Sequence, residues 1–497
     1  MTLRRTRIVC TLGPASFSEE RIEALIRAGM DVARLNFSHG SYAEHGATIE
    51  RVRAVADRLG VPVALLQDLQ GPKIRTGALA DGKPVTLRDG QAFTITKQQI
   101  AGTSERVSTT YAALPQDVKP GDRILLSDGA IEMQVNGASE DEVICTVVHG
   151  GELAEHQGIN LPGVAVSAPA LTEKDRADLA FGVSQHVDAI ALSFVRQPED
   201  VHEAKRLIAA ALRSAPNFPQ DERLPEGLHP TAYAAEETIP VIAKLEKPEA
   251  VAPPERLRAI LEAADGVMVA RGDLGVEMPL EDVPLIQKRI ITQANALGIP
   301  VITATQMLES MITTPRPTRA EVSDVANAIL DGSDAMMLSG ETAVGAYPVE
   351  TVATMARIAL ATEQECAFAP FHPEHPSDAH AVSSAAHTLA REAHVKLIAV
   401  FTRTGASAHL ISKERPTMPI IAFTPSEIVY RRLMFWWGVV PRLSELLGAT
   451  EELIAWTDAE LQRAGYAQPG DEIVIMGGMP IAGKARTNFL KLHRIGE

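Results

Sequence analysis

Residues Pro240–Glu277, with the sequence PVIAKLEKPEAVAPPERLRAILEAADGVMVARGDLGVE, contain two short apolar runs that each end in charged residues. The first run ends in Lys244-Leu245-Glu246 and the second ends in Arg271-Gly272-Asp273. Between them, Arg256–Ala263 has the apolar spacing of a helix. A strand, a helix and a parallel strand form a right-handed βαβ unit, whose two strands end at the same edge of the sheet. Both charged clusters are therefore expected at one carboxyl-end face.

These charged residues favour phosphate chemistry. Strand alternation places Lys244 and Glu246 on the same side of the chain. Glu246 and Asp273 then supply two hard oxygen ligands, the usual protein share for Mg²⁺, which keeps waters and takes other ligands from substrate. The ammonium of Lys244 can neutralise charge on a phosphoryl group in transfer. The alternative is a simple salt bridge at the rim of a barrel, and the rest of the chain has to decide between the two.

The totals limit the class of protein. The chain has 497 residues, enough for two or three domains, and a net charge of −16, which argues against a nucleic-acid or anionic-membrane partner. Its three cysteines are too far apart for a disulfide framework or a metal cluster: Cys10, Cys145 and Cys366. No apolar signal region follows Arg4, Arg5 and Arg7, and no run approaches a membrane span. We expect a soluble cytoplasmic protein.

Eight short apolar runs alternate with helical segments, among them Ser18–Arg27 and Tyr42–Leu59. The runs are Thr6–Cys10, Val32–Leu35, Val63–Leu66, Ala189–Ser193, Pro240–Ala243, Gly266–Ala270, Pro300–Ala304 and Ala335–Leu338. This pattern predicts an α/β fold, a (β/α)₈ TIM barrel formed by residues 1–71 and 169–363, with the working groups in the loops after the strands.

The alternation of apolar runs and helical segments is interrupted at residues 72–168, where the pattern becomes that of short strands. Short alternating segments such as AFTIT and EMQV are separated by Asp-Gly and Asn-Gly dipeptides, which are hairpin signals. These dipeptides are Asp81-Gly82, Asp89-Gly90, Asp128-Gly129 and Asn136-Gly137. We expect an all-β domain, a small β-barrel inserted after the third strand, and we interpret it as a lid over the catalytic face.

Two irregular segments follow. Arg213–Thr238 is rich in proline and acidic residues and is expected to be a solvated insertion away from the active site. Residues 364–377 contain three prolines and predict a linker to a separate C-terminal α/β domain at 378–497. Three histidines at this linker, His372, His375 and His380, could indicate a metal site, but their proline-broken setting favours a solvated connector.

The C-terminal domain shows three apolar runs, Leu397–Phe401, Pro419–Phe423 and Glu472–Met476, and two loops of interest. The first loop, Thr402-Arg403-Thr404-Gly405-Ala406-Ser407, follows a strand and opens a helix, a geometry suited to an anion. The second, Gly478–Lys484, has the spacing of a P-loop. Ala485 stands where Ser or Thr should hold Mg²⁺, so an anion-binding effector loop is favoured over nucleotide hydrolysis.

Further motifs are expected on the catalytic face of the barrel. They are RLNFSHG at 34–40, DLQGPKIR at 68–75, ARGDLG at 270–275, TATQMLES at 303–310, RPTRAEVSDVAN at 316–327 and LSGETA at 338–343. In these motifs, their order, the inserted β domain and the C-terminal domain, the chain closely resembles the pyruvate kinase family over nearly its full length.

The resemblance implies transfer of the phosphoryl group of phosphoenolpyruvate to ADP, giving ATP and pyruvate in glycolysis, with Mg²⁺ as cofactor and Mn²⁺ as an alternative. Lys244 would lie beside the phosphoryl group, Glu246 and Asp273 would hold the metal, and Arg34 and Arg75 would face phosphate. The backbone of Ala270, Arg271, Gly272 and Asp273, with the hydroxyl of Thr305, would form a cradle for the substrate carboxylate. The proton would be delivered near Thr305, with Ser339 and Glu341 as more distant parts of the proton network. Asn36, His39 and Arg75 would make contacts on the nucleotide or cation side.

One departure from the family concerns K⁺. Many members bind K⁺ through residues matching Asn36, Ser38 and Asp68, and they carry a glutamate where this chain has Lys73. The lysine is similar to K⁺-independent members and could supply the missing charge permanently, so catalysis without K⁺ is expected, with Lys73 part of the catalytic set. Thr76 instead resembles the K⁺-dependent type. The alternative is an exposed lysine without a role.

The C-terminal loops leave the effector open. Thr402, Arg403, Thr404, Gly405, Ser407 and Lys484 form the expected effector loop. Ala406 occupies a position that is often basic in sugar-bisphosphate-activated members, so the ligand could be a sugar monophosphate, a nucleotide or nothing. The resemblance also implies a homotetramer.

Two other functions compete with the kinase interpretation. One is a Mg²⁺-dependent lyase or aldolase of a 2-oxo acid, which would need neither the lid nor the cations for phosphate. The other is a non-catalytic metabolite-binding regulator, which would not need an intact Lys244, Glu246, Asp273 and Thr305.

Overall fold

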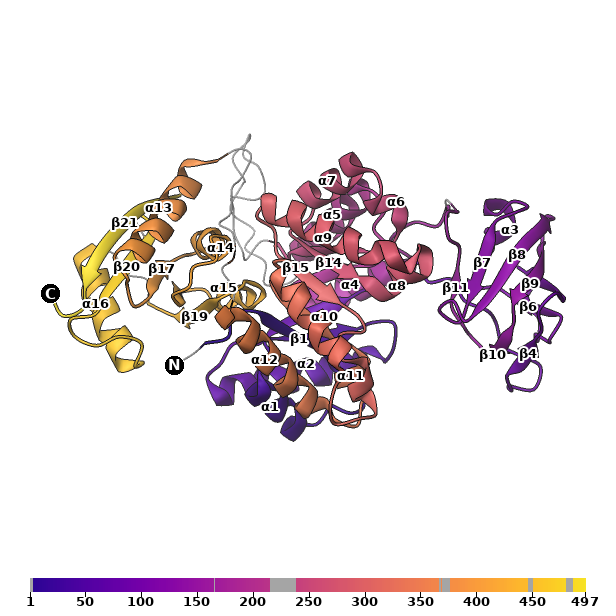
Figure 1. Ribbon diagram of the computed structural model, residues 1–497, viewed down its shortest axis with the longest axis horizontal. Helices are drawn as coiled ribbons and strands as arrows, with labels where there is room; N and C mark the ends of the chain where they lie inside the picture. Colours follow the sequence, from indigo (N-terminus) through magenta and orange to yellow (C-terminus); the bar gives the residue numbers. More distant parts are fainter. Residues whose placement is uncertain are drawn as a thin grey trace.

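The computed structural model describes residues 3–164, 166–214, 238–365, 368, 376–445, 450–479 and 486–497. Figure 1 shows an elongated molecule in which a central barrel lies between a β-rich insertion at one end and a C-terminal α/β part at the other. The Arg213–Thr238 insertion, His372, His375 and Lys484 fall wholly or almost wholly outside the described residues. No helix of the described chain is both long and apolar enough to cross a membrane.

Eight parallel strands close the central barrel in the order β1-β16-β15-β14-β13-β12-β3-β2. They are β1 (Arg7–Thr11), β2 (Val32–Asn36), β3 (Ala64–Asp68), β12 (Ala189–Leu192), β13 (Val241–Leu245), β14 (Gly266–Ala270), β15 (Val301–Ala304) and β16 (Ala335–Leu338). Nearly every residue in them is buried, which explains why each appears in the sequence as a continuous apolar run. The predicted TIM barrel is therefore confirmed, each strand within two residues of its expected bounds.

The helices between the strands surround the barrel (Figure 1). The main ones are α1 (Glu19–Ala28), α2 (Tyr42–Leu59), α4 (Glu173–Ser184), α5 (Pro198–Ser214), α7 (Pro254–Ala263), α9 (Val283–Ala296), α10 (Arg319–Leu330) and α12 (Pro348–Glu365). Helix α2 begins with a capping box between Ser41 and Glu44, and its chain leaves through Gly60 at φ 65°, so local chemistry fixes both ends. Short helices directly follow three strands at the carboxyl end: α6 (Pro248–Val251), α8 (Arg271–Glu277) and α11 (Gly340–Ala343).

An aspartate precedes every second strand at the amino end of the barrel. Asp334 donates its backbone N–H to the carbonyl of Val301 (2.9 Å) and accepts the N–H of the same residue on Oδ2 (2.8 Å). The same double contact joins Asp31 to Ile8, Asp188 to Leu65 and Asp265 to Val241. Each of these aspartates therefore fastens the start of one strand to its neighbour.

The C-terminal part docks on this amino-end rim. Lys413 and Arg415 lie 2.7 and 3.0 Å from the two carboxylate oxygens of Asp334. Arg431 lies 3.0 Å from Asp188, which also binds Arg53 of the barrel. The docking face is therefore opposite the carboxyl-end face where the charged sequence motifs gather.

The insertion consists of β4 (Val85–Leu87), β5 (Ala92–Thr96), β6 (Arg106–Ser108), β7 (Arg123–Leu126), β8 (Ile131–Ala138), β9 (Glu142–His149), β10 (Gly151–Leu153), β11 (Ile159–Asn160) and the single helical turn α3 (Leu114–Asp117). Six strands form one sheet in the order β11-β7-β8-β9-β5-β6, and β10 pairs with β4. Isolated bridges join the two sheet edges, from Arg75 to Gly158 and from Thr76 to Thr109. The expected β-barrel is thus closed by single bridges instead of a continuous ladder.

Of the four hairpin predictions in the insertion, one is confirmed and three are wrong: Asp81-Gly82 lies before β4, the first strand of the insertion, and Asp89-Gly90 joins β4 to β5, which do not pair with each other. Asp128-Gly129 forms the turn between β7 and β8, with φ values of 54° and 91°. Asn136-Gly137 instead lies inside β8, where the register against β9 shifts between Val135 and Gly137. A glycine in a strand can mark a bulge as well as a turn, and the dipeptide alone does not separate the two cases.

The C-terminal part has a five-stranded sheet in the order β19-β18-β17-β20-β21. Its elements are α13 (Asp378–Glu392), β17 (Ile398–Phe401), α14 (Ala406–Lys413), β18 (Ile420–Thr424), α15 (Glu427–Arg432), β19 (Val439–Leu443), α16 (Thr450–Arg463), β20 (Glu472–Gly478) and β21 (Thr487–Arg494). The three predicted strands are confirmed, but β19 and β21 were not predicted. Both lie at sheet edges; Pro441 interrupts the first, and polar residues interrupt the second.

Candidate active site

Lys244 lies in a buried cluster at the carboxyl end of β13. Its Nζ is 2.9 Å from Glu246 Oε1, 3.2 Å from Asp68 Oδ1 and 2.8 Å from the hydroxyl of Ser193. The approach of Lys244 to Glu246 is what strand alternation predicted. Burial by itself would lower the pKa of Lys244, but the carboxylates of Asp68 and Glu246 raise it, so the side chain stays an ammonium.

Arg34 brings a second cation to the same cluster. Its Nε lies 2.6 Å from Asp68 Oδ2, and its Nη1 donates to the hydroxyl of Thr11 (2.8 Å). Burial would raise the pKa of Asp68, but Lys244 and Arg34 together lower it below its usual value. One ionised carboxylate thus holds two cations side by side at the barrel mouth. Such a pair of cations suits a phosphate group.

Glu246 and Asp273 have the chemistry of a divalent metal site. Burial raises the pKa of Glu246; Lys244 lowers it, and the nearby charge of Asp273 raises it again. The backbone N–H of Phe194 donates to Glu246 Oε2 at 2.6 Å, which fixes the orientation of the carboxylate. A buried Glu246 beside a half-buried Asp273 would gain from a dication between them, and two carboxylates are a normal protein share for Mg²⁺. The residues therefore fit Mg²⁺.

Thr305 and Gly272, which the sequence assigns to a carboxylate cradle, lie together at the ends of β14 and β15. The backbone N–H of Gly272 donates to Thr305 Oγ1 (2.6 Å), and that hydroxyl donates to the carbonyl of Ala304 (2.6 Å). Thr305 has φ 70°, which is strained for a β-branched residue and is often found at functional positions. The guanidinium of Arg271 donates to Asp324 (2.8 Å) and to the carbonyls of Thr305 (2.8 Å) and Ala304 (3.3 Å), so it ties the end of β14 to the end of β15.

Glu341 joins two loops beneath the cradle. It is fully buried, and its Oε1 accepts the N–H of Leu308 (3.2 Å) while Oε2 accepts the N–H of Ser339 (2.6 Å). Ser339 and Glu341, two positions apart in the chain, are thus in direct contact, and their role in a proton network stays a prediction. The contact holds the loop after β16 to the loop that follows Thr305 after β15.

The expected nucleotide-side residues lie at the end of β2, for Asn36 and His39, and at the start of the insertion, for Arg75. Asn36 Oδ1 accepts the N–H of Ser38 (3.1 Å). Burial lowers the pKa of His39, and the charges of Arg75, Lys73 and Arg34 lower it further, so these three cations act on one place. The guanidinium of Arg75 donates to the carbonyl of His156 (2.9 Å) and is therefore attached to the insertion.

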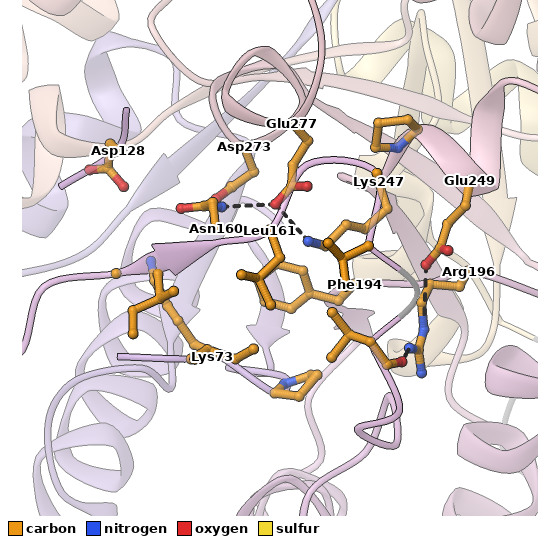
Figure 2. Close-up of a pocket in the computed structure, with 18 residues that line it drawn as sticks. Lys73, Asp128, Asn160, Leu161, Phe194, Arg196, Lys247, Glu249, Asp273 and Glu277 are labelled. Carbon is orange, nitrogen blue, oxygen red and sulfur yellow. Dashed lines mark hydrogen bonds and ion pairs between the residues drawn. The ribbon is translucent and has the colours of Figure 1, made fainter. Parts of the chain in front are cut away.

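A cleft of about 150 Å³ separates the insertion from the barrel. Figure 2 shows Lys73, Asp128 and Asn160 on the insertion side, facing Phe194, Lys247, Asp273 and Glu277 of the barrel. The predicted residues Lys73 and Asp273 line this cleft, whereas Asn36 and His39 do not. Of the two carboxylates Glu246 and Asp273, only Asp273 lines the cleft.

Sequence reasoning missed several polar side chains of the site. Thr11 and Ser193 were given no role, although each stands at the carboxyl end of a predicted barrel strand, where working groups are expected. Their position at the end of a strand could have identified both as candidate site residues. Asn160 carried no comparable signal, because it meets Glu277 only when the insertion folds against the barrel. Lys247 and Glu277 pair within the barrel, shortly after the predicted strands that end at Glu246 and Asp273, and they were also given no role.

The predicted effector loop is described except for Lys484. Thr402 Oγ1 accepts the N–H of Gly405 (2.9 Å), and Ser407 shares a hydrogen bond of 2.7 Å with Thr487. Gly405 has φ 89°, which a residue with a side chain would adopt only with strain. The loop is thus a preformed turn that opens α14, as the sequence predicted.

The barrel, the paired cations and the carboxylate pair are the arrangement that a phosphotransferase needs. Family models agree. Residues 3–216 and 230–352 match "Pyruvate kinase, barrel domain", and residues 380–493 match "Pyruvate kinase, alpha/beta domain". The chain belongs to the pyruvate kinase family.

Relatives support this assignment over the whole length. The chain is 47% identical to a pyruvate kinase of Mycobacterium intracellulare over 495 residues, which covers 99% of each. It is 45% identical to a pyruvate kinase of Geobacillus stearothermophilus, covering 99% of this chain and 81% of the relative. A solved pyruvate kinase from Cryptosporidium parvum superimposes with a TM-score of 0.88 at 36% identity, covering 99% of this chain and 96% of the other. The chain is therefore a phosphotransferase enzyme.

Proposed function

We propose that this protein transfers the phosphoryl group of phosphoenolpyruvate to ADP, giving ATP and pyruvate. The observation that carries the proposal is the Lys244 ammonium, held between Asp68 and Glu246 next to Arg34. Phosphoenolpyruvate carries phosphate and carboxylate charge, so it needs cations on one side and hydrogen-bond donors on the other. A 2-oxo-acid lyase would have no use for the paired cations, and a binding regulator would have no use for an ionised Lys244.

In the proposed mechanism, Arg34 and Lys244 bind the phosphate and stabilise the charge that spreads over its oxygens during transfer. Asp68 orients both cations. The backbone N–H groups after β14 and the hydroxyl of Thr305 hold the substrate carboxylate and keep the reacting carbon fixed. Glu246 and Asp273 would hold Mg²⁺, or Mn²⁺ in its place, which supplies positive charge beside the phosphoryl oxygens when it is bound.

The proton that converts the enolate to pyruvate reaches the site near Thr305 in this proposal. Thr305 Oγ1 carries one hydrogen, which it donates to Ala304, and Glu341 positions the following loops through Leu308 and Ser339. Asn36, His39 and Arg75 form the nucleotide side. Because Arg75 is attached to the insertion, closing of the insertion would bring this cation to the nucleotide phosphates.

The test is pyruvate formation from phosphoenolpyruvate and ADP with Mg²⁺, followed by coupled reduction of pyruvate. Activity that depends on all three components is expected. If the wild-type protein forms no pyruvate even with candidate effectors, the proposed reaction is wrong.

We also propose that catalysis does not require K⁺, because the ammonium of Lys73 supplies the charge. Its support is the position of Lys73 in the cleft and its effect on His39 beside Arg34 and Arg75. Equal rates are expected in K⁺-free and K⁺-containing buffers of the same ionic strength. The variant Lys73→Glu should regain activity only with K⁺; equal activity of this variant without K⁺ would show that the lysine has no such role.

The remaining proposals concern regulation and assembly. The turn Thr402–Ser407 supports binding of a phosphorylated effector, either a sugar monophosphate or a nucleotide. The protein is proposed to be a homotetramer in the cytoplasm. Titration of the full chain with each metabolite should lower the concentration of phosphoenolpyruvate at half-saturation. Mass photometry measures the assembly, and a monomer at working concentration would exclude the tetramer.

A further inference from the structure

Asn160 connects the insertion to the barrel. Within the described residues it is the one residue of the 72–168 insertion whose side chain hydrogen-bonds a barrel side chain, donating from Nδ2 to Glu277 Oε1 at 3.0 Å. A turn of the insertion packs on the same helix, because a Cβ placed on Gly129 would lie 3.9 Å from Val276. The insertion therefore rests on α8.

Glu277 receives two donors on one oxygen. Lys247 Nζ lies 2.6 Å from the same Oε1 that Asn160 binds, and the Glu277 side chain is only 2% exposed. Figure 2 shows Asn160 and Lys247 converging on this carboxylate. A buried carboxylate is costly unless charged or polar partners satisfy it, so the ion pair depends on both donors for a complete environment.

Both barrel residues of this contact lead to the expected metal carboxylates. Glu277 is the last residue of α8 and stands four positions after Asp273, which places the two on one side of the helix. Lys247 directly follows Glu246 in the chain. Each of these two residues is therefore one helical turn or one peptide bond away from an expected metal carboxylate.

Phe194 adds a second connection. Its ring centroid lies 5.7 Å from Lys247 Nζ, a cation–π distance, while its backbone N–H donates to Glu246 Oε2. Phe194 holds a positive φ of 55°, so its backbone is retained in a strained conformation by these surroundings. The position of Lys247 thus affects the group that orients Glu246.

We propose that Asn160, Glu277 and Lys247 form a latch through which packing of the insertion positions the carboxylate pair and raises its affinity for a divalent cation. All three are positioning residues, since none of them carries the metal. When the insertion moves away, Glu277 loses one donor, and the segments that carry Glu246 and Asp273 become looser. The consequence for turnover rests on the proposed function, whereas the effect on cation affinity does not.

The test uses Mn²⁺ alone as a spin probe on the full chain without substrate. Asn160→Asp replaces the donor with a second carboxylate that faces Glu277. We expect about tenfold weaker Mn²⁺ binding, corresponding to about 1.4 kcal/mol. In the double variant Asn160→Asp with Glu277→Gln, the new amide can donate to the new carboxylate, and affinity should return to within about threefold of wild type.

A matched control is Asn136→Asp, which adds the same charge to the same insertion. Asn136 donates to Thr146 within the insertion and contacts no barrel side chain in the described structure, so Mn²⁺ binding should not change. Hydrogen exchange supplies a readout independent of metal. Segments 69–75 and 161–168 at the two hinges should exchange faster in Asn160→Asp and recover in the double variant.

Each outcome either supports the latch or overturns it. Faster exchange inside β8 and β9 of Asn160→Asp would indicate a misfolded insertion. Asn160→Ala, which adds no charge, then replaces that variant and should weaken Mn²⁺ binding about threefold. Wild-type affinity for Mn²⁺ in both Asn160→Asp and Asn160→Ala would overturn the latch. The latch would also be overturned if the double variant bound Mn²⁺ no more tightly than Asn160→Asp. If the wild-type protein binds Mn²⁺ but forms no pyruvate, the proposed reaction fails while the latch is still decided by binding.

Discussion

Asp68 Oδ1 lies 3.2 Å from Lys244 Nζ, although the two residues come from strands β3 and β13, which are separated by β12. The other oxygen of Asp68 binds Arg34 at 2.6 Å. The two cations would repel each other without this carboxylate. Asp68 therefore holds the two cations of the proposed phosphate site side by side without any substrate.

Asp68→Asn should reduce kcat about a hundredfold, because the neutral amide no longer holds Arg34 and Lys244 in place and only part of the transition-state charge is then stabilised. Steady-state rates with phosphoenolpyruvate and ADP measure the effect. Asp265→Asn, at the opposite end of the barrel, is the matched substitution and should leave kcat unchanged. An equal loss in both variants would mean that barrel stability, not cation placement, had been changed.

Thr305→Val should lose far more activity than Thr305→Ser. Valine has the same shape but lacks the hydroxyl that accepts from Gly272 and donates to Ala304. We expect a loss of about a hundredfold for valine and less than tenfold for serine, measured as kcat at saturating substrate. Similar rates for the two variants would exclude a role for the hydroxyl.

Asp334→Ala should destabilise the protein by about 3–5 kcal/mol, since Lys413 and Arg415 would be left buried without their counter-ion. Asp265→Ala removes the same contact to a neighbouring strand, but its partner Lys205 is 30% exposed, so a cost of about 1 kcal/mol is expected. Urea unfolding of the two variants compares them directly. Equal costs would assign the effect to the strand contact alone.

His409 predicts how stability depends on pH. Burial lowers its pKa to about 4, and its ring stacks on Trp436 with a centroid distance of 3.9 Å. The unfolded chain takes up a proton on this residue below its ordinary value of 6.5, whereas the folded protein does not until about pH 4. Stability should therefore fall by about 1.4 kcal/mol per pH unit between those values through this group.

His409→Gln removes this proton uptake and keeps a donor for the carbonyl of Gly298. Its free energy of unfolding should depend less steeply on pH in that window than that of the wild type, as measured by urea titration at several pH values. His202→Gln, at an exposed position on α5, should follow the wild-type curve. Parallel curves for wild type and His409→Gln would show that His409 is not the responsible group.

The barrel was predictable because each of its strands is buried on both faces and therefore appears as an uninterrupted apolar run. The edge strand β19 was not, since Pro441 breaks its pattern, and Asn136-Gly137 misled because a bulge and a turn share the same residues. In the site, Lys244 and Glu246 could be placed together from alternation alone. The contact of Asn160 with Glu277 could not, because it depends on how one domain packs against another.

The amino-end aspartates have a consequence for how the chain can be divided. Asp188 has one cation from the barrel itself, Arg53, whereas both cations that contact Asp334 come from the C-terminal part. A truncated barrel ending near residue 365 would lose both of these cations and would expose the face on which the C-terminal part docks, at the start of β16, the strand that leads to Ser339. The C-terminal part is thus the source of both counter-ions of Asp334, and a cut at the linker would remove them together.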